Sequence, residues 1–151
     1  MTLERDTSIT ELGDDARTEV RAGIVVFSDN MSPAEIAAHV GIEPTEQSIK
    51  GEPLPGKRTR RVVIARHRWA WRPDGPERSL DAQLDAVWAA LGSQADAFKR
   101  LPADAEVVVD IWIEHYGDDL RLGWALDRRH VSAAAAFGAS IDVDEYDYTE
   151  D

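Results

Sequence analysis

The stretch FSDNMSPAEIAAHVGIEP, residues 27–44, constrains the fold more than any other part of the chain. Ser32 is a favourable helix N-cap, Pro33 suits the first helical position, and Glu35 lies three residues after the cap, where it completes a capping box. Gly41 suits the left-handed position that commonly ends a helix. The sequence therefore predicts a short helix with sharply defined ends.

Extended segments flank this helix, and the same order returns near the C-terminus. The run 23–27 is rich in apolar and β-branched residues, which favour a strand. Later, a predicted strand ending at Leu126 is followed by an alanine-rich helix at 128–137, by Gly138 and by an extended run at 140–143. The repetition of strand and helix predicts a fold, but it does not predict an activity.

The middle of the chain alternates apolar and polar residues with the period of a strand. In the segment 60–71 the predicted buried face consists of Val63, Ala65, His67, Trp69 and Trp71. The opposite face carries Arg66, Arg68 and Arg72. A helix opening at Ser79 follows, and Leu84 and Trp88 lie at helical spacing within it, so this helix should cover the sheet. Packing beneath or within this layer is the simplest role for the three tryptophans.

A second alternating segment, 107–116, predicts another strand. Its inward residues are Val107, Val109, Ile111 and Ile113, and its outward residues are Asp110, Trp112 and Glu114. The turn residues 117–119 would join this strand in a hairpin to a strand at 120–126. Residues 45–59 contain prolines and glycines that break any regular pattern, and they predict a loop.

The predicted order of elements is β-α-β-α-β-β-α-β, an α+β class with helices on one face of a mostly antiparallel sheet. From residue 60 onward this is the order of ferredoxin-like domains. The second face of such a sheet stays open to solvent or to a partner. We expect one domain at residues 21–148, a flexible acidic segment at 1–20 and an acidic tail at 149–151.

Composition limits the functional classes. The chain has no cysteine, which excludes thiol catalysis, cysteine-based zinc sites and disulfides. No apolar run reaches the roughly 20 residues that span a bilayer, and the N-terminus lacks the basic and apolar parts of a signal peptide. We therefore expect a cytoplasmic protein. The formal net charge of −12 opposes binding to membranes and, at physiological salt, to nucleic acid.

Metal and cofactor chemistry has little support in the residue pattern. The histidines His39, His67, His115 and His130 show no metal-binding spacing, and we expect no metal and no cofactor. His67 and His115 fall on the inward faces of their strands. There they would be hydrogen-bonded core residues or, if the two strands are neighbours, a pH-sensitive pair.

The polar residues Ser28, Asp29 and Asn30 follow the first predicted strand. They would form either a catalytic corner or a set of side chains that satisfy backbone groups at the helix entrance, which short polar residues commonly do. Asp142 and Asp144 have the spacing of a hydrolytic dyad, but they lie in a predicted acidic tail without a partner of a different role.

Several motifs together resemble a protein family. They are Phe27-Ser28, Ser32-Pro33-x-Glu35-Ile36, Gly41-Ile42-x-Pro44, Gly51, Trp69, the helical spacing from Leu84 to Leu101, and an ending with Gly138, Ile141-Asp142 and Tyr146. On these residues the chain resembles the uncharacterised bacterial domain of unknown function 4279 family, over about residues 24–146. The alanine-rich last helix and the first twenty residues depart from the pattern. The resemblance implies a fold and no particular reaction.

The strongest interaction signal is the arginine face of the segment 60–71. Basic residues interleaved with aromatic ones can hold single-stranded nucleic acid, but these arginines would also pair with Asp110 and Glu114 across the sheet or bind an acidic protein. Trp112 lies between those two acids, which makes it a candidate for the open surface. The residues predicted to bind are Arg66, Arg68, Arg72, Trp112, Asp110 and Glu114.

We therefore expect a non-catalytic bacterial binding module that presents an open sheet face to another protein, as an immunity or toxin-neutralising protein would. The alternative is a small hydrolase or transferase with a polar site around residues 28–30. A structure separates the two. An enzyme needs a concave pocket with convergent polar groups, whereas a binder needs a filled core beneath an exposed sheet.

Overall fold

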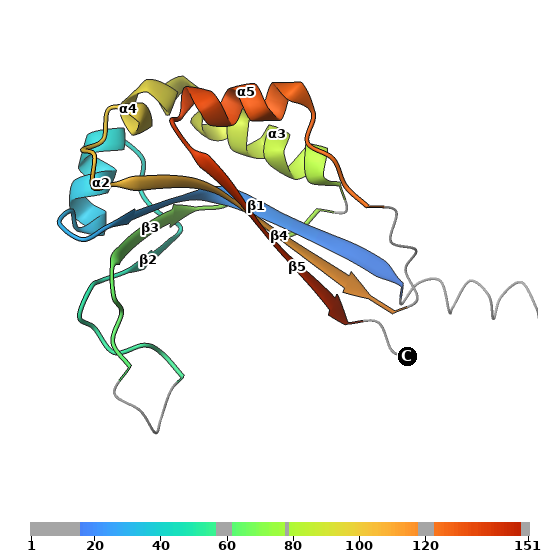
Figure 1. Cartoon of the computed structure of the whole chain (residues 1–151), viewed down its shortest axis with the longest axis horizontal. Helices are drawn as coiled ribbons and strands as arrows, with labels where there is room; N and C mark the ends of the chain where they lie inside the picture. The colour runs from blue at the N-terminus through green and yellow to red at the C-terminus, as the bar shows by residue number, and fades with distance from the viewer. Residues whose placement is uncertain (1–15, 57–61, 78, 118–122, 149–151) are drawn as a thin grey trace, which may run out of the picture.

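A five-stranded sheet in the order β2-β3-β1-β4-β5 forms the centre of the computed structural model, which describes residues 16–56, 62–77, 79–117 and 123–148. Figure 1 shows the helices of the described residues gathered on one face of this sheet. The elements are β1 (Arg17–Ser28), α2 (Pro33–Val40), β2 (Glu46–Ser48), β3 (His67–Trp71), α3 (Leu80–Leu91), the 3-10 turn η1 (Gly92–Gln94), α4 (Ala95–Lys99), β4 (Glu106–Tyr116), α5 (Arg128–Ala136) and β5 (Ser140–Tyr148). The predicted α+β class is confirmed.

The central strand β1 pairs antiparallel with β3 on one side and with β4 on the other, and β2 pairs antiparallel with β3. Among the described strands, only β4 and β5 run parallel, and α5 lies between them in the chain. Parallel neighbours need a crossover of this kind. The sheet is mixed but mostly antiparallel, as predicted.

The helix α2 has the ends that its sequence predicts. The Ser32 hydroxyl accepts the Glu35 backbone N–H at 3.2 Å, which is the N-cap bond of the predicted capping box, and it donates to the Glu35 carboxylate at 3.2 Å. At the other end, Gly41 has φ = 75°, a left-handed conformation that side chains disfavour. These local contacts fix where the chain leaves β1 and where it turns toward β2.

The helix-covered face of the sheet holds the core. Trp69 of β3 is fully buried, and its ring meets the Phe98 ring of α4 edge-on with centroids 5.4 Å apart. Phe98 packs on Phe137, and Phe137 packs on Trp88 of α3, at centroid distances of 5.2 and 5.6 Å. The Trp69 indole N–H donates to the Ile42 carbonyl oxygen at 3.2 Å, so its polar atom is satisfied. The predicted burial of Trp69 is confirmed.

The strand predicted at residues 60–71 is shorter than expected. The described part begins to pair with β1 only at His67, and Val63 is 55% exposed. Residues 49–56 and 62–64 instead leave the sheet as an arm, visible in Figure 1, in which the Gly51 N–H donates to the Ile64 carbonyl and the Leu54 N–H donates to the Val62 carbonyl. The arm pairs with itself, so Val63 has no neighbouring strand of the sheet against which to bury. The short strand β2 lies within the predicted loop at residues 45–59 and was not predicted.

The predicted hairpin partner of β4 is not a strand in its described part. Residues 123–127 have no strand structure, and residues 118–122 lie outside the described residues. The reason is topological. β4 pairs with β1 along its whole length and with β5 from Val108 onward, so both of its edges are already occupied.

The first and last strands reach further than predicted. β1 begins at Arg17, inside the segment predicted to be flexible, and its first residues pair with the end of β4. β5 continues to Tyr148 through the acidic run predicted to be a tail. Residues 1–15 and 149–151 lie outside the described residues. None of the described helices combines the length and the apolar character needed to cross a bilayer.

Candidate functional site

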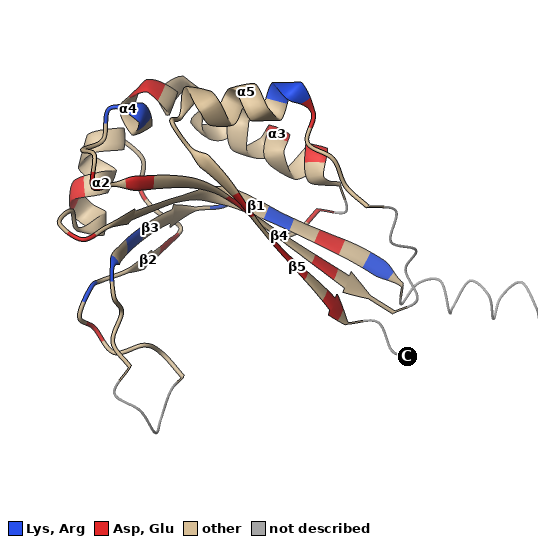
Figure 2. Cartoon of the chain, viewed as in Figure 1, with Lys and Arg blue, Asp and Glu red and all other residues tan. Residues whose placement is uncertain are grey.

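The strands present a second set of side chains away from the helices, and we call this surface the open face. Neighbouring strands align these residues in rows, such as Val25 of β1 beside Val108 of β4, which lies beside Ser140 of β5. Figure 2 shows acidic and basic residues on the strands that build it. The open-face residues include Arg17, Arg21, Gly23, Val25 and Phe27 of β1, Arg68 and Arg72 in or just after β3, Glu106, Val108, Asp110, Trp112, Glu114 and Tyr116 of β4, and Ser140, Asp142, Asp144, Tyr146 and Tyr148 of β5.

Four aromatic rings form a continuous stack on the open face, which we call the aromatic ladder. Trp112 stacks on Tyr146 with centroids 4.5 Å apart, Tyr146 on Tyr148 at 6.3 Å, and Tyr148 on Tyr116 at 5.2 Å. The parallel register brings these rings together, because Tyr116 and Tyr148 are direct partners across β4 and β5. Tyr146 is 38% exposed and Tyr148 is 50% exposed. The ladder therefore offers aromatic surface that no described element covers.

Glu114 holds the ladder in place. Its carboxylate accepts the Trp112 indole N–H at 2.7 Å and the Tyr116 hydroxyl through its other oxygen. The hydrogen bond to Glu114, aided by desolvation and by the negative charge of Glu114, raises the pKa of Tyr116 to about 12. The guanidinium of Arg17 lies 4.3 Å from the centre of the Tyr116 ring. These contacts restrict the positions of the Trp112 and Tyr116 rings.

A buried ion pair crosses the open face. The guanidinium of Arg72 reaches over β1 to Asp110 of β4, with nitrogen and oxygen 2.6 Å apart and both side chains less than a fifth exposed. Gly23 lies between them, and a Cβ placed there would be 2.4 Å from the Trp71 carbonyl oxygen and 2.7 Å from the Arg72 Cγ. Only a glycine leaves room for this crossing.

The other two predicted arginines also pair within the chain. Arg66 contacts Glu106 at 2.9 Å and Arg68 contacts Glu46 at 3.3 Å. The prediction that these arginines form ion pairs within the chain is therefore confirmed, and Asp110 is one of the partners, as predicted. The prediction that Glu114 is also a partner is wrong. Glu114 bonds instead to the aromatic ladder.

Beside the ladder the open face is hollowed into what we call the acidic groove, with a volume of about 440 Å³. Its lining consists of Val25, Phe27, Arg68, Glu106, Val108, Asp110, Ser140, Ile141, Asp142 and Asp144. The carboxylates of Asp110, Asp142 and Asp144 offer oxygen atoms that all lie within 4.8 Å of one another. Hard divalent cations prefer such oxygens, but the Arg72 guanidinium already occupies Asp110.

The residues predicted to bind did not include Tyr116, Asp142, Asp144, Tyr146 or Tyr148 of the open face. The acidity of residues 142–148 suggested a tail, and for this reason the alternation of residues typical of a strand was not recognised there. Asp142, Asp144, Tyr146 and Tyr148 recur with period two, which is the signal of a strand with one exposed face. Asp142 and Asp144 lie in β5 beside β4, not in a tail.

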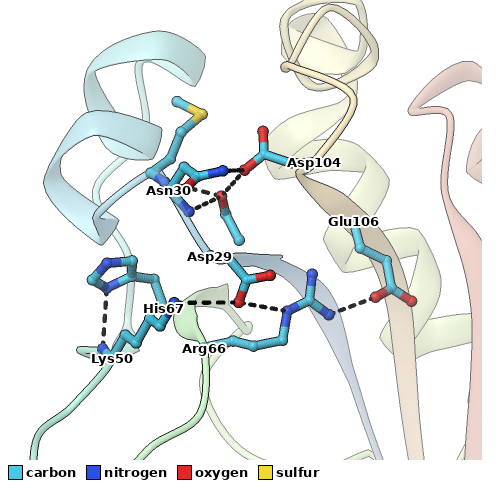
Figure 3. A network of polar contacts seen from close by, with 9 residues as sticks. Asp29, Asn30, Lys50, Arg66, His67, Asp104 and Glu106 are labelled. Atoms are coloured by element: carbon cyan, nitrogen blue, oxygen red, sulfur yellow. Dashed lines mark hydrogen bonds and ion pairs between the residues drawn. The ribbon is translucent and has the colours of Figure 1, made fainter.

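The polar corner after β1 has the geometry of a helix entrance (Figure 3). Ser28 is fully buried, and its hydroxyl donates to Asp104 at 2.9 Å while accepting the backbone N–H groups of Asn30 and Met31. The hydrogen bond from Ser28, with a further one from Asn30, lowers the pKa of Asp104. The Ser28 hydroxyl therefore donates one hydrogen bond and accepts two, so it has no free lone pair with which to act as a nucleophile.

Asp29 also has a structural role at this corner. It lies 3.8 Å from the Lys50 ammonium and 3.9 Å from Arg66, so it links the arm to the sheet. In the same view, His67 accepts the Lys50 backbone N–H rather than contacting Ser28. The residues 28–30 thus support the chain where β1 becomes α2.

The condition for a pair between His67 and His115 is not met, because their strands are not neighbours. β1 separates β3 from β4, and the register places His67 beside Ser28 and His115 beside Thr18, at opposite ends of β1. His115 instead hydrogen bonds to Thr18 at 3.0 Å and to Glu145 at 2.7 Å. It is a hydrogen-bonded core histidine.

A family model matches residues 18–148, and it carries the description domain of unknown function (DUF4279). The chain belongs to this family. No curated protein and no solved structure matches the chain. The DUF4279 model spans the whole described sheet except the first residue of β1, so the open face and the helix-covered face both lie within the family domain.

Proposed function

We propose that this DUF4279 chain is a non-catalytic binding module of the bacterial cytoplasm whose open face docks another protein. The observation that carries the proposal is the aromatic ladder, a row of large rings on an uncovered sheet face. Tyrosine and tryptophan are enriched at protein interfaces, because they combine a large contact area with few rotatable bonds. Soluble proteins rarely leave such a row uncovered without a use for it.

The ladder is also ordered in advance, which lowers the entropic cost of binding. Trp112 and Tyr116 are both hydrogen bonded to one carboxylate of Glu114, and Trp112 stacks on Tyr146. A surface that must adapt to its partner would lose side-chain freedom on contact. The side chains of the aromatic ladder have already lost much of their rotational freedom on folding.

The charge of the surface favours a protein with a basic binding site. The chain carries a formal net charge of −12, and the ladder is bordered by the carboxylates of the acidic groove. Such a surface repels nucleic acid and anionic membranes. It suits the masking of a cationic surface, as an immunity or toxin-neutralising protein would do it.

The alternative, a small hydrolase or transferase with its site at residues 28–30, gains no support from the geometry. Ser28 is buried and hydrogen bonded to Asp104 and to two backbone N–H groups. A catalytic serine needs an exposed hydroxyl beside a general base. The polar groups of this corner are instead paired with one another.

Site-specific photocrosslinking tests the proposal. A photoreactive phenylalanine analogue replaces Tyr146 on the open face in one protein and Val131, an exposed residue of α5, in a second. In extracts of the cells that encode the chain, we expect one protein to crosslink from position 146 and not from position 131. That protein, once purified, should bind the native chain and should bind Trp112→Ala at least about 2 kcal/mol more weakly. Crosslinking from position 131 alone, or equal affinity for Trp112→Ala, would overturn the proposal.

A further inference from the structure

We propose that the docked partner places an arginine or lysine side chain of an extended segment in the acidic groove, with the charged head group between Asp142 and Asp144 and beside the Trp112–Tyr146 stack. This inference rests on the proposed function, because it names the chemistry of the partner that the open face would receive. It is argued from the charge, the shape and the aromatic border of the groove.

The charges of the acidic groove are only partly balanced within the chain. Asp110 is paired with Arg72 at 2.6 Å. In the part of the chain that the structure describes, neither Asp142 nor Asp144 has a cationic partner, although both lie within 4.8 Å of Asp110. Neighbouring carboxylates repel one another, so a cation from outside would relieve this repulsion and gain attraction from both acids.

The shape of the groove suits a long basic side chain. Phe27 contributes partly exposed apolar surface beside the nearly buried Val25 and Val108, while the acids lie together along β4 and β5. Lysine and arginine have an apolar stem that ends in a charged head, and they bury the stem along apolar surface while the head stays with polar groups. A groove of about 440 Å³ has room for one such side chain. A bare inorganic cation would leave its apolar surface unused.

The chain itself shows that this surface accepts guanidinium groups. Arg17 lies over the Tyr116 ring at one end of the aromatic ladder, Arg72 pairs with Asp110 of the groove lining, and Arg68 itself lines the groove. The other end of the ladder, Trp112 on Tyr146, adjoins the groove, because Trp112 and Asp144 are direct partners across β4 and β5. A cation held there would gain both a carboxylate and an aromatic face.

A second copy of the chain is a poor occupant of this surface. Two open faces brought together would set the carboxylates of one groove against those of the other, and like charges in contact cost several kcal/mol. A nucleic acid would meet the same repulsion along its phosphates. A basic protein segment is the occupant whose charge complements the groove.

Isothermal titration calorimetry with a defined probe tests the inference. The probe is the blocked peptide acetyl-Arg-Ser-Arg-Ser-Arg-Ser-amide, in which alternate residues of an extended chain would face the sheet, and the matched peptide has glutamate in place of arginine. Titrations are done at about 0.15 M salt, where the Debye length is about 8 Å and distant charges are screened. We expect the arginine peptide to bind and the glutamate peptide not to bind.

Two double variants with the same change in net charge separate the groove from the general negative field. Asp142→Asn with Asp144→Asn alters the groove, and Glu43→Gln with Asp96→Asn alters exposed acids elsewhere. The groove variant should weaken the peptide at least about tenfold, since it removes both acids at the bound head group, while the control variant should change the affinity less than about twofold. Equal weakening by both variants would overturn the inference, because it would show only long-range attraction.

The same variants are measured against the protein that crosslinks at position 146. If that protein needs Trp112 but binds the groove variant as tightly as the native chain, the inference fails and the proposed function stands. If it needs neither Trp112 nor the two acids, both fail. Circular dichroism melting of the groove variant confirms that it is folded, and removing like charges from an exposed strand should not lower its Tm.

Discussion

The two faces of the sheet use the same kinds of residues for different ends. Trp69, on the helix-covered face, is fully buried and gives its N–H to a backbone carbonyl. Trp112, on the open face, gives its N–H to Glu114 and stacks on the partly exposed Tyr146. The first indole fills a core that helices close. The second is held by hydrogen bonding and stacking at a surface, which is an arrangement that contributes little to folding and offers much to a partner.

The same contrast holds for the charged residues. The core face of β1 and β4 consists mostly of valine, isoleucine and alanine, whereas the open face carries acids and arginines in alternate positions. We infer that stability resides mainly on the covered face, and the proposed function assigns recognition to the open face. The predictions below test this division, beginning with the largest expected effect.

Trp69→Ala should destabilise the fold most. The change removes a large buried ring and its contact with Phe98, and such truncations cost about 3 to 5 kcal/mol through lost burial and the cavity left behind. Chemical denaturation measures the loss. Trp124→Ala is the matched control, since Trp124 is 44% exposed, and it should cost far less. Similar losses for both would mean that the covered face does not dominate stability.

Gly23→Ala should be the largest effect on the open face. Its new Cβ would lie 2.4 Å from the Trp71 carbonyl oxygen, so the β1–β3 pairing or Arg72 must move, at a cost of about 1 to 3 kcal/mol. Gly92→Ala is the control, because a Cβ there meets nothing within 4 Å and the backbone has φ = −57°. That control should be neutral or stabilising by up to about 1 kcal/mol. If Gly23→Ala does not change the free energy of unfolding, the absence of a side chain at residue 23 is not what allows Arg72 to reach Asp110.

Arg66→Ala and Arg68→Ala should each change the free energy of unfolding by only about 0 to 1 kcal/mol, because their ion pairs with Glu106 and Glu46 are largely exposed to solvent. Thermal melts at low and high salt check both the size and the screening. A several times larger loss of unfolding free energy for either variant would show that the open face also contributes strongly to stability, which would contradict the division between the two faces.

Tyr116 should show its environment in an alkaline titration. Its pKa is raised to about 12 from an ordinary value of 10.0, so the folded state favours the neutral phenol. The corresponding stabilisation is present below pH 10 and is lost as the pH rises from about 10 to about 12. Ultraviolet titration of the phenolate should find one late tyrosine in the native chain, and Glu114→Gln should move it earlier. If the pKa of this tyrosine stays high in Glu114→Gln, the hydrogen bond to Glu114 is not the cause of the raised pKa.

Local signals predicted part of this molecule well. The cap residues Ser32, Glu35 and Gly41 defined α2, because helix ends depend on neighbours in the chain. The alternation in residues 107–116 assigned the two faces of β4, including the outward positions of Asp110, Trp112 and Glu114. Such patterns depend only on the period of the strand, which the sequence displays directly.

Contacts between distant segments were beyond such reasoning. The position of β5 beside β4 creates both the aromatic ladder and the acidic groove, yet it depends on a pairing that no local pattern encodes. Pairing of Arg72 with Asp110 was one of the predicted alternatives, but its route over Gly23 was not, because that route joins three strands. The strand β2 has only three residues and no apolar alternation, so it gives no periodic signal.

The most direct test of the division between the two faces combines stability and binding in one variant, Trp112→Ala with Tyr146→Ala. The account predicts that the free energy of unfolding falls by clearly less than the loss of about 3 to 5 kcal/mol expected for Trp69→Ala. It predicts that affinity for the protein crosslinked at position 146 falls by at least about 2 kcal/mol, as expected of central interface aromatics. A variant that binds this protein as tightly as the native chain, or that unfolds as readily as Trp69→Ala, would contradict it.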